Sequence, residues 1–448
     1  MPESSEHRQR LSLVGAVVVV AGLVIGAGIF KTPAMIAGLV AQGQIVWIWV
    51  SAAALSLIGA LCYVELMSRF PSQRGEIGFL SNAFGPRMAF VYGWSKATVI
   101  NPGAIAMLAF VLADYWTPIL PALSTQGPVI AFLLVLALTL LNLRGLRSST
   151  RFQFVLLTLE VALLVAVSLA SFWFSADQPA QALATAQGPV NAGLGAIGLA
   201  MIFALLTFGG WNEAAYLVRD LREGSRQMLL VLVISLGLIA AVYLLVNLAL
   251  VQLFGADQLS QKKAPIGDMA ELVLGKWGIV LVLTVVTASI LTSINATMVV
   301  GARATASVAV GWSRLNGLAG WRGEDLSYVP ALIFQTAISL GLVLFASLSK
   351  EAFSALVEFT APVYWGFLTL VGVSLLVLRR RHPNASGFRV PLGPLLPVTF
   401  VVCSAYLTFS SLRYADSQGQ AWIALVVLAV GIVASRFVGH PKPDLPEA

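Results

Sequence analysis

Residues 24–33 read VIGAGIFKTP and place two glycines near the midpoint of the first long apolar run. Residues 206–213 read LTFGGWNE and place a Gly-Gly pair at the corresponding point of the sixth apolar run. A glycine costs about 1 kcal/mol in a helix interior relative to alanine. Two such pairs, each beside polar side chains, predict that both helices are interrupted.

An interrupted helix exposes backbone N–H and C=O groups, which are costly in lipid unless a partner satisfies them. A small molecule with both a carboxylate and an ammonium can be that partner, because helix N-termini attract anions and C-termini attract cations. Breaks in spans one and six fit a five-plus-five inverted repeat with a binding site between the halves. Glycines also permit close helix packing, as the spacing of Gly22 and Gly26 allows. Either pair alone favours packing, whereas two pairs at matching positions favour a binding site.

The composition of this 448-residue chain predicts a membrane protein. Hydrophobic residues make up 58% of it, charged residues 10%, and the mean hydropathy is +0.88. A soluble protein of this size could not keep so much apolar surface from water. The net charge of +7 does not indicate a nucleic-acid partner, because the basic residues lie in short clusters between apolar runs. That pattern is typical of the cytoplasmic side of a multi-pass protein.

Twelve apolar runs are close to the length of about 20 residues that crosses a bilayer. Twenty of the 27 Lys and Arg residues lie in the N-terminus and alternate loops, and five lie in the other loops. This asymmetry predicts that both termini are cytoplasmic, in an inner (plasma) membrane. The first run is too long for a signal peptide and lacks a cleavage motif, so we expect it to be a helix. The predicted spans are 13–39, 45–69, 86–114, 128–143, 152–174, 193–219, 228–252, 276–302, 328–346, 354–378, 394–412 and 420–437.

These spans divide the chain into five parts. Apolar spacing within residues 264–274 also predicts a short external helix across the mouth of the protein. The five parts are a cytoplasmic N-terminus (1–12), a first repeat of five helices (13–174), a second repeat of five helices (193–378), two additional helices (394–437) and a cytoplasmic tail (438–448).

Four motifs occur in the order found in the amino acid–polyamine–organocation superfamily. They are the glycine motif with Pro33, FGGWNEAAY at 208–216, the first cytoplasmic loop at 70–86 and FRVPLGP at 388–394. The chain resembles this superfamily, and most closely its bacterial amino acid permeases similar to L-type amino acid transporters. The resemblance implies an all-α, LeuT-like fold of ten core helices, with helices one and six broken, plus two C-terminal helices. It also implies transport by alternating access.

The resemblance further implies how an amino acid would bind to the two breaks. Its carboxylate would accept hydrogen bonds from the N–H groups of Ala27 and Gly28. Its ammonium would donate to the carbonyl oxygens of Val24, Leu206 and Gly209. The breaks themselves would therefore recognise the part of the substrate that all amino acids share.

Side chains around the breaks complete the predicted site. Phe208 and Trp211 would act as gates or pocket walls. Asn101 and Asn295 would lie near the substrate side chain, although hydrogen bonds between helices explain these two residues equally well. The predicted substrate-binding residues are Val24, Ile25, Gly26, Ala27, Gly28, Leu206, Thr207, Phe208, Gly209, Gly210, Trp211, Asn101 and Asn295.

The chain departs from the family pattern at several positions. In the first cytoplasmic loop Arg74 replaces a glycine, and Ile77 and Phe79 occupy positions that are usually tyrosine. Many L-type-like relatives carry a lysine midway along helix five, where its ammonium stands in for sodium. This chain has Glu160 there, so that mechanism cannot be carried over.

Ionisable side chains within spans are functional candidates, because an unpaired charge is costly there. Glu160 is a candidate to carry a proton, or it makes a structural hydrogen bond, for example to Lys96. Lys96 is also a coupling candidate, but it lies near the cytoplasmic end of span three, where snorkelling is the favoured explanation. Glu213 follows the second break and is either a coupling group or a carboxylate stabilised by a helix N-terminus. Glu65 is expected to be structural.

The predicted function is secondary transport of a small neutral amino acid, either in exchange or with protons. Apart from Glu213, no acidic residue lies at either break, so a cationic substrate would have no clear partner. A transporter of another small amine or a nucleobase, and a nutrient sensor that does not transport, are the alternatives. The spans contain no His, no H-E-x-x-H and no paired aspartates, so no enzyme, metal or cofactor is predicted. The expected partners are the substrate, the bilayer and possible coupling protons.

Overall fold

The computed structural model describes residues 12–26, 28–72, 74–116, 126–144, 150–176, 193–216, 221, 224–310, 328–349, 351–419 and 421–437. Within these ranges the regular elements are all helices, and the predicted terminal parts (1–12 and 438–448) lie almost wholly outside them. The elements are α1 (Leu13–Val24), α2 (Gly28–Ala37), α3 (Gln42–Arg69), α4 (Glu76–Phe84), α5 (Pro86–Ser95), the π-helical η1 (Lys96–Ile100), α6 (Asn101–Trp116), α7 (Gly127–Leu143), α8 (Thr150–Ala176), α10 (Leu194–Thr207), the 3-10 helix η3 (Trp211–Tyr216), α11 (Gly224–Ser260), α12 (Pro265–Leu274), α13 (Lys276–Val310), α14 (Val329–Ser347), α15 (Ala352–Arg381), α16 (Leu395–Ser417) and α17 (Ala421–Phe437).

These helices coincide with the predicted spans. In the described part of the chain, eight helices are long and apolar enough to cross a membrane, and the bent pair α1–α2 makes a ninth. Shorter apolar helices, α7, α10 and α17, cover the other three predicted spans. The all-helical, multi-pass membrane class is therefore confirmed. Twelve crossings and a LeuT-like inverted repeat stay predictions.

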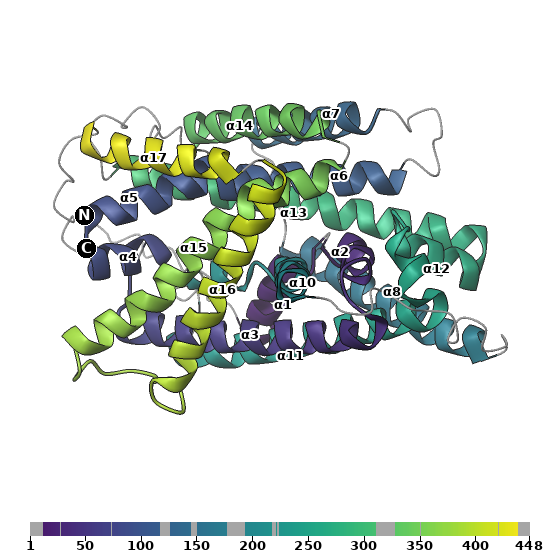
Figure 1. Cartoon of the computed structure of the whole chain (residues 1–448), viewed down its shortest axis with the longest axis horizontal. Helices are drawn as coiled ribbons and strands as arrows, with labels where there is room; N and C mark the ends of the chain where they lie inside the picture. The colour runs from purple at the N-terminus through teal and green to yellow at the C-terminus, as the bar shows by residue number, and fades with distance from the viewer. Residues whose placement is uncertain are drawn as a thin grey trace, which may run out of the picture.

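The helices form two packed groups with the broken spans in one of them. In the first group α2 packs on α10 and α11, and α3 packs on α10 and α11. In the second group α6 packs on α7, α13 and α14. Figure 1 shows the second group lying above the first, with α15 and α16 running across the molecule. The broken spans thus face helices of the other group.

The short helix α12 corresponds to the predicted external helix at 264–274. It begins at Pro265 and ends before Gly275, whose φ of +66° is a conformation that favours glycine. It packs chiefly on α13 and also contacts α8, α11 and α2. The helix is present as expected, and its side of the membrane stays a prediction.

Candidate functional site

The first span is interrupted between Val24 and Gly28. α1 ends at Val24, and the N–H of Ile25 still donates to the carbonyl of Ala21 at 2.7 Å. α2 begins at Gly28, and its axis is bent by 47° from that of α1. Ala27 lies outside the described residues. The predicted break in this helix is confirmed.

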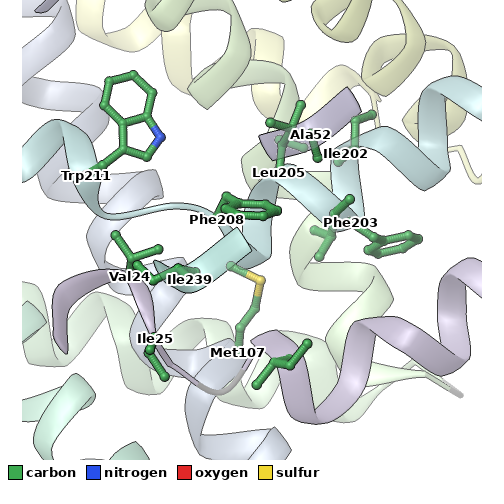
Figure 2. Packing of buried hydrophobic residues seen from close by; sticks show 14 of the residues in the cluster. Val24, Ile25, Ala52, Met107, Ile202, Phe203, Leu205, Phe208, Trp211 and Ile239 are labelled. Carbon is green, nitrogen blue, oxygen red and sulfur yellow. The ribbon is translucent and has the colours of Figure 1, made fainter. Parts of the chain in front are cut away.

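The second break follows the end of α10 at Thr207. A turn through Gly209 and Gly210 leads from α10 into the 3-10 helix η3. Gly210 has a φ of +103°, which a residue with a Cβ rarely adopts. Figure 2 shows the non-helical segment between Phe208 and Trp211, whose rings lie apart at its two ends. The predicted interruption of this helix is also present.

The two breaks pack directly against each other. A Cβ on Gly28 would lie only 2.8 Å from the Cα of Thr207, and one on Gly210 would overlap the carbonyl oxygen of Leu23. The hydroxyls of Thr32 and Thr207 are 2.7 Å apart and share a hydrogen bond. Gly28 and Gly210 are therefore needed for the close approach of two segments that are far apart in the sequence.

Tyr243 on α11 connects the C-terminal end of α1 with that of α10. Its hydroxyl lies 3.3 Å from the carbonyl oxygen of Val24 and 3.4 Å from that of Thr207, close enough to donate to either. Its ring packs edge-on against Trp49 and Phe208, with centroids 5.8 and 5.2 Å away. One buried side chain thus fixes where α1 and α10 end relative to each other. The sequence pattern does not single it out.

A cavity of about 240 Å³ lies beside both breaks. Its walls come from α1, α6, α10, α13 and α15, so both helix groups contribute. The coupling candidates Lys96 and Glu213 also line it. The predicted substrate-binding residues that line it are Val24, Gly26, Gly28, Asn101, Leu206, Thr207, Gly209 and Gly210.

The two aromatic residues of the second break lie outside this lining. Phe208 is fully buried, and its ring centroid is 6.1 Å from that of Trp49. The Trp211 ring packs edge-on against the Tyr63 ring, with centroids 5.0 Å apart. Both rings hold the break in place by packing behind it. Their role as gates stays a prediction.

Asn101 and Asn295 differ in their surroundings. Asn101 contributes to the cavity wall. Asn295 accepts a hydrogen bond at 2.7 Å from the side-chain amide of Asn142, which joins α13 to α7. Ile25 is buried outside the lining. Of the two asparagines, then, one lines the cavity and the other links two helices.

At one end of the cavity lies a buried charge cluster, which we call the Glu76 cluster. Lys96 Nζ is 3.1 Å from Glu76 Oε2 and 2.7 Å from Glu213 Oε1. The side chains of Lys96 and Glu76 are each 2% exposed and that of Glu213 is 18% exposed. Lys96 is therefore an ion-pair partner, and the expectation that it snorkels to the interface is wrong. The members of the cluster are Tyr63, Glu76, Tyr92, Lys96, Asn212 and Glu213.

The Glu76 carboxylate joins three separate segments. Its Oε1 accepts from the Tyr63 hydroxyl at 2.6 Å and from the Asn212 amide at 3.1 Å. The Tyr92 hydroxyl donates to its Oε2. Because Asn212 belongs to η3, the loop helix α4 holds the second break directly. The motif that includes Glu76 was recognised in the sequence, but its contact with the break was not.

Glu160 lies on α8, away from this cluster. It is 2% exposed, and the Ser289 hydroxyl on α13 donates to its Oε1 at 2.9 Å. The suggested hydrogen bond to Lys96 is wrong, because that ammonium pairs with other carboxylates. A proton-carrying role for Glu160 stays a prediction.

Glu65 makes the contacts expected of a structural residue. It accepts from Arg69 at 3.0 Å, from two nitrogens of Arg379 at 2.7 and 2.5 Å, and from the backbone N–H of Val390 at 2.7 Å. A buried carboxylate is stable when it is paired and hydrogen-bonded in this way. It joins α3 and α15 to the loop that carries the FRVPLGP motif.

A chain with this many apolar helices and a central cavity beside two broken spans belongs to the class of multi-pass membrane proteins that move small solutes. The comparison with known families is more specific: the chain belongs to the amino acid permease family, whose model matches residues 11–434. This confirms the resemblance to the amino acid–polyamine–organocation superfamily.

Curated relatives match the chain over nearly its full length. The b(0,+)-type amino acid transporter 1 of Mus musculus is 24% identical, with 97% of this chain and 89% of that protein covered. The large neutral amino acids transporter small subunit 2 of Homo sapiens is 25% identical, with 97% and 79% covered. The Asc-type amino acid transporter 1 of Mus musculus is 24% identical, with 95% and 80% covered. These names indicate an amino acid transporter rather than an enzyme.

Proposed function

We propose that this protein is a secondary active transporter that moves small neutral amino acids across the inner membrane by alternating access. The observation that carries the proposal is the direct packing of the two breaks around one cavity. It supports a five-plus-five repeat, in which corresponding helices of the two halves meet at the substrate. With both termini cytoplasmic, α2 and α10 are the outer halves of the broken spans, and α1 and η3 are the inner halves.

The helix ends at the cavity match the two charges of an amino acid. The first N–H groups of α2, beginning at Gly28, have no partner within their own helix, and the positive end of the helix dipole is there. They suit the substrate carboxylate. The ends of α1 and α10 offer carbonyl oxygens of Val24 and Leu206 to the ammonium. Both carbonyls already accept one hydrogen bond, and each has a second lone pair.

The cavity wall favours a small neutral side chain. Opposite the breaks the wall includes Ala104, Met107, Val300 and Val357, which are small or apolar. The charged side chains described in the wall, Glu76, Lys96 and Glu213, are joined to one another by ion pairs. The name of one relative described above refers to large neutral amino acids, which agrees with a neutral side chain and not with a small one.

Transport should be tested with purified protein in proteoliposomes and labelled alanine, serine, threonine and leucine. Uptake is measured with and without internal amino acid, and with and without an inward proton gradient. Uptake that requires internal amino acid would identify an exchanger. Uptake driven by the proton gradient and lost in Glu160→Gln would identify a proton symporter coupled through that carboxylate.

The matched control is Glu271→Gln, which neutralises an exposed carboxylate on α12 and should leave uptake unchanged in either mode. Saturable uptake of an amine without a carboxylate, or of a nucleobase, in place of every amino acid would contradict the proposal. Binding of an amino acid without uptake in any condition would favour a sensor instead.

A further inference from the structure

We propose that an outer latch, built around the ion pair of Lys31 and Asp114, holds α2 against α6 and separates each time the cavity opens at that end. Lys31 Nζ is 2.6 Å from Asp114 Oδ2, and the two side chains are 8% and 31% exposed. Beside them the Tyr115 hydroxyl donates to the carbonyl oxygen of Phe30 at 2.8 Å. The rings of Phe30 and Tyr115 also pack edge-on, with centroids 5.8 Å apart. These four residues make up the outer latch.

The latch and the Glu76 cluster lie at opposite ends of the cavity. Lys96 and Asp114 belong to one continuous span, Pro86–Trp116, and are eighteen residues apart. At 1.5 Å per residue this corresponds to about 27 Å along the axis. The cavity residues Asn101, Met107 and Val111 lie between them on the same span. Each end of the cavity therefore has its own charged connection.

The latch joins two helices that pack mainly on different neighbours, and α12 is a second connection because it packs on both α2 and α13. α2 belongs with α10, because Gly28 lies against Thr207 and the Thr32 hydroxyl bonds that of Thr207. α6 packs instead on α7, α13 and α14 (Figure 1). Movement of the α2–α10 unit away from α6 would separate Lys31 from Asp114 and leave the contacts within each unit intact.

The chemistry of the pair suits a contact that forms and breaks repeatedly. A buried charge that loses its partner is strongly unfavourable unless water replaces that partner. Asp114 is already partly exposed, and Lys31 would become exposed as α2 moves outward, so water can reach both groups. α12 lies over this region, since a Cβ on Gly267 would be 3.7 Å from the Tyr115 ring.

The inference rests on the proposed transport function, so its first test does not require transport. In a background with Cys62→Ala and Cys403→Ala, Met107→Cys places a thiol in the cavity wall. The rate at which a membrane-impermeant maleimide labels this thiol from outside is measured in right-side-out vesicles. That rate reports how often the outer end is open.

We expect Lys31→Met and Asp114→Asn each to raise the labelling rate about tenfold, and the double variant to raise it no further. The control, Lys262→Met, removes an outer lysine that pairs with Asp268 at 2.9 Å, and should leave the rate unchanged. Unchanged labelling in both latch variants would overturn the inference. Faster labelling together with a wild type that transports no amino acid would uphold the latch and reject the proposed substrate.

The second test locks the latch. Lys31→Cys with Asp114→Cys is joined by a short bis-methanethiosulfonate linker, and amino acid uptake is measured before and after reduction. We expect at least a tenfold loss of uptake that a reductant restores. The control, Trp116→Cys with Thr287→Cys, joins α6 to α13 within one group, where the native side chains bond at 3.0 Å, and should keep its uptake. Full uptake by a completely cross-linked latch would overturn the inference.

Discussion

The outer latch and the Glu76 cluster are both charged connections across the cavity, but their burial differs. At the outer end one ion pair and one hydrogen bond join two helices, and Asp114 is 31% exposed. At the other end Lys96 lies between two carboxylates and is 2% exposed. Partly exposed pairs contribute about 0–1 kcal/mol, whereas removing one partner of a buried pair costs about 3–5 kcal/mol. The outer end should therefore separate at a much smaller cost.

The largest effect is expected from Lys96→Met. It leaves the carboxylates of Glu76 and Glu213 buried without their cation, so the free energy of unfolding should fall by about 3–5 kcal/mol. Denaturant titration in detergent micelles measures this loss. Lys276→Met, at an exposed position at the start of α13, is the matched control and should stay within about 0.5 kcal/mol of wild type.

Lys96→Met combined with Glu213→Gln should be more stable than Lys96→Met alone, because one of the two stranded charges is then removed. If Lys96→Met lowers the free energy of unfolding by less than about 1 kcal/mol, the comparison is contradicted. The ion pairs of the Glu76 cluster would then be no stronger than a surface pair.

An intermediate effect is expected from Tyr115→Phe. The substitution keeps the ring contact with Phe30 and removes only the hydroxyl that donates to its carbonyl. The free energy of unfolding should fall by about 1 kcal/mol, the usual net contribution of one hydrogen bond. Both variants are then compared in the Met107→Cys labelling experiment. Tyr414→Phe is the control, because it removes a tyrosine hydroxyl on α16 outside the cavity wall. If Tyr115→Phe and Tyr414→Phe give equal labelling rates, the Tyr115 hydroxyl does not contribute to the outer latch.

The smallest effect on stability is expected from Lys31→Met. Its loss leaves an aspartate that water already reaches, so the free energy of unfolding should fall by only about 0.2–1 kcal/mol. The same denaturant titration measures it beside Lys96→Met. If Lys31→Met lowers the free energy of unfolding as much as Lys96→Met does, the outer latch and the Glu76 cluster are equally strong. The outer latch would then not be the easier of the two to separate.

The sequence pattern predicted the helices and the breaks more reliably than it predicted side-chain partners. The helix positions follow from local hydrophobicity, and the breaks follow from glycine pairs, so both depend on short stretches of chain. Lys96 shows the opposite case. Its position near a helix end favoured snorkelling, but its partners come from α4 and η3, which are 20 and 117 residues away in the sequence.

The candidate site was partly predictable for the same reason. The backbone of the breaks could be located from Gly28 and Gly210, and both positions line the cavity. Tyr243 could not be found, because nothing in its apolar surroundings distinguishes it from a core tyrosine. Asn101 and Asn295 could not be told apart either, because which asparagine meets a cavity depends on how α6, α7 and α13 pack.

By itself the sequence determined that this chain is an all-helical membrane protein, that two of its spans are interrupted, and that it resembles the family to which it belongs. These properties depend on composition, short-range periodicity and contiguous motifs. Only the tertiary structure decided which charges pair, which rings pack behind the breaks, and that Lys31 meets Asp114 across 83 residues of sequence. The reason is physical: an ion pair depends on distances of a few ångströms between side chains, and those distances are set by helix packing.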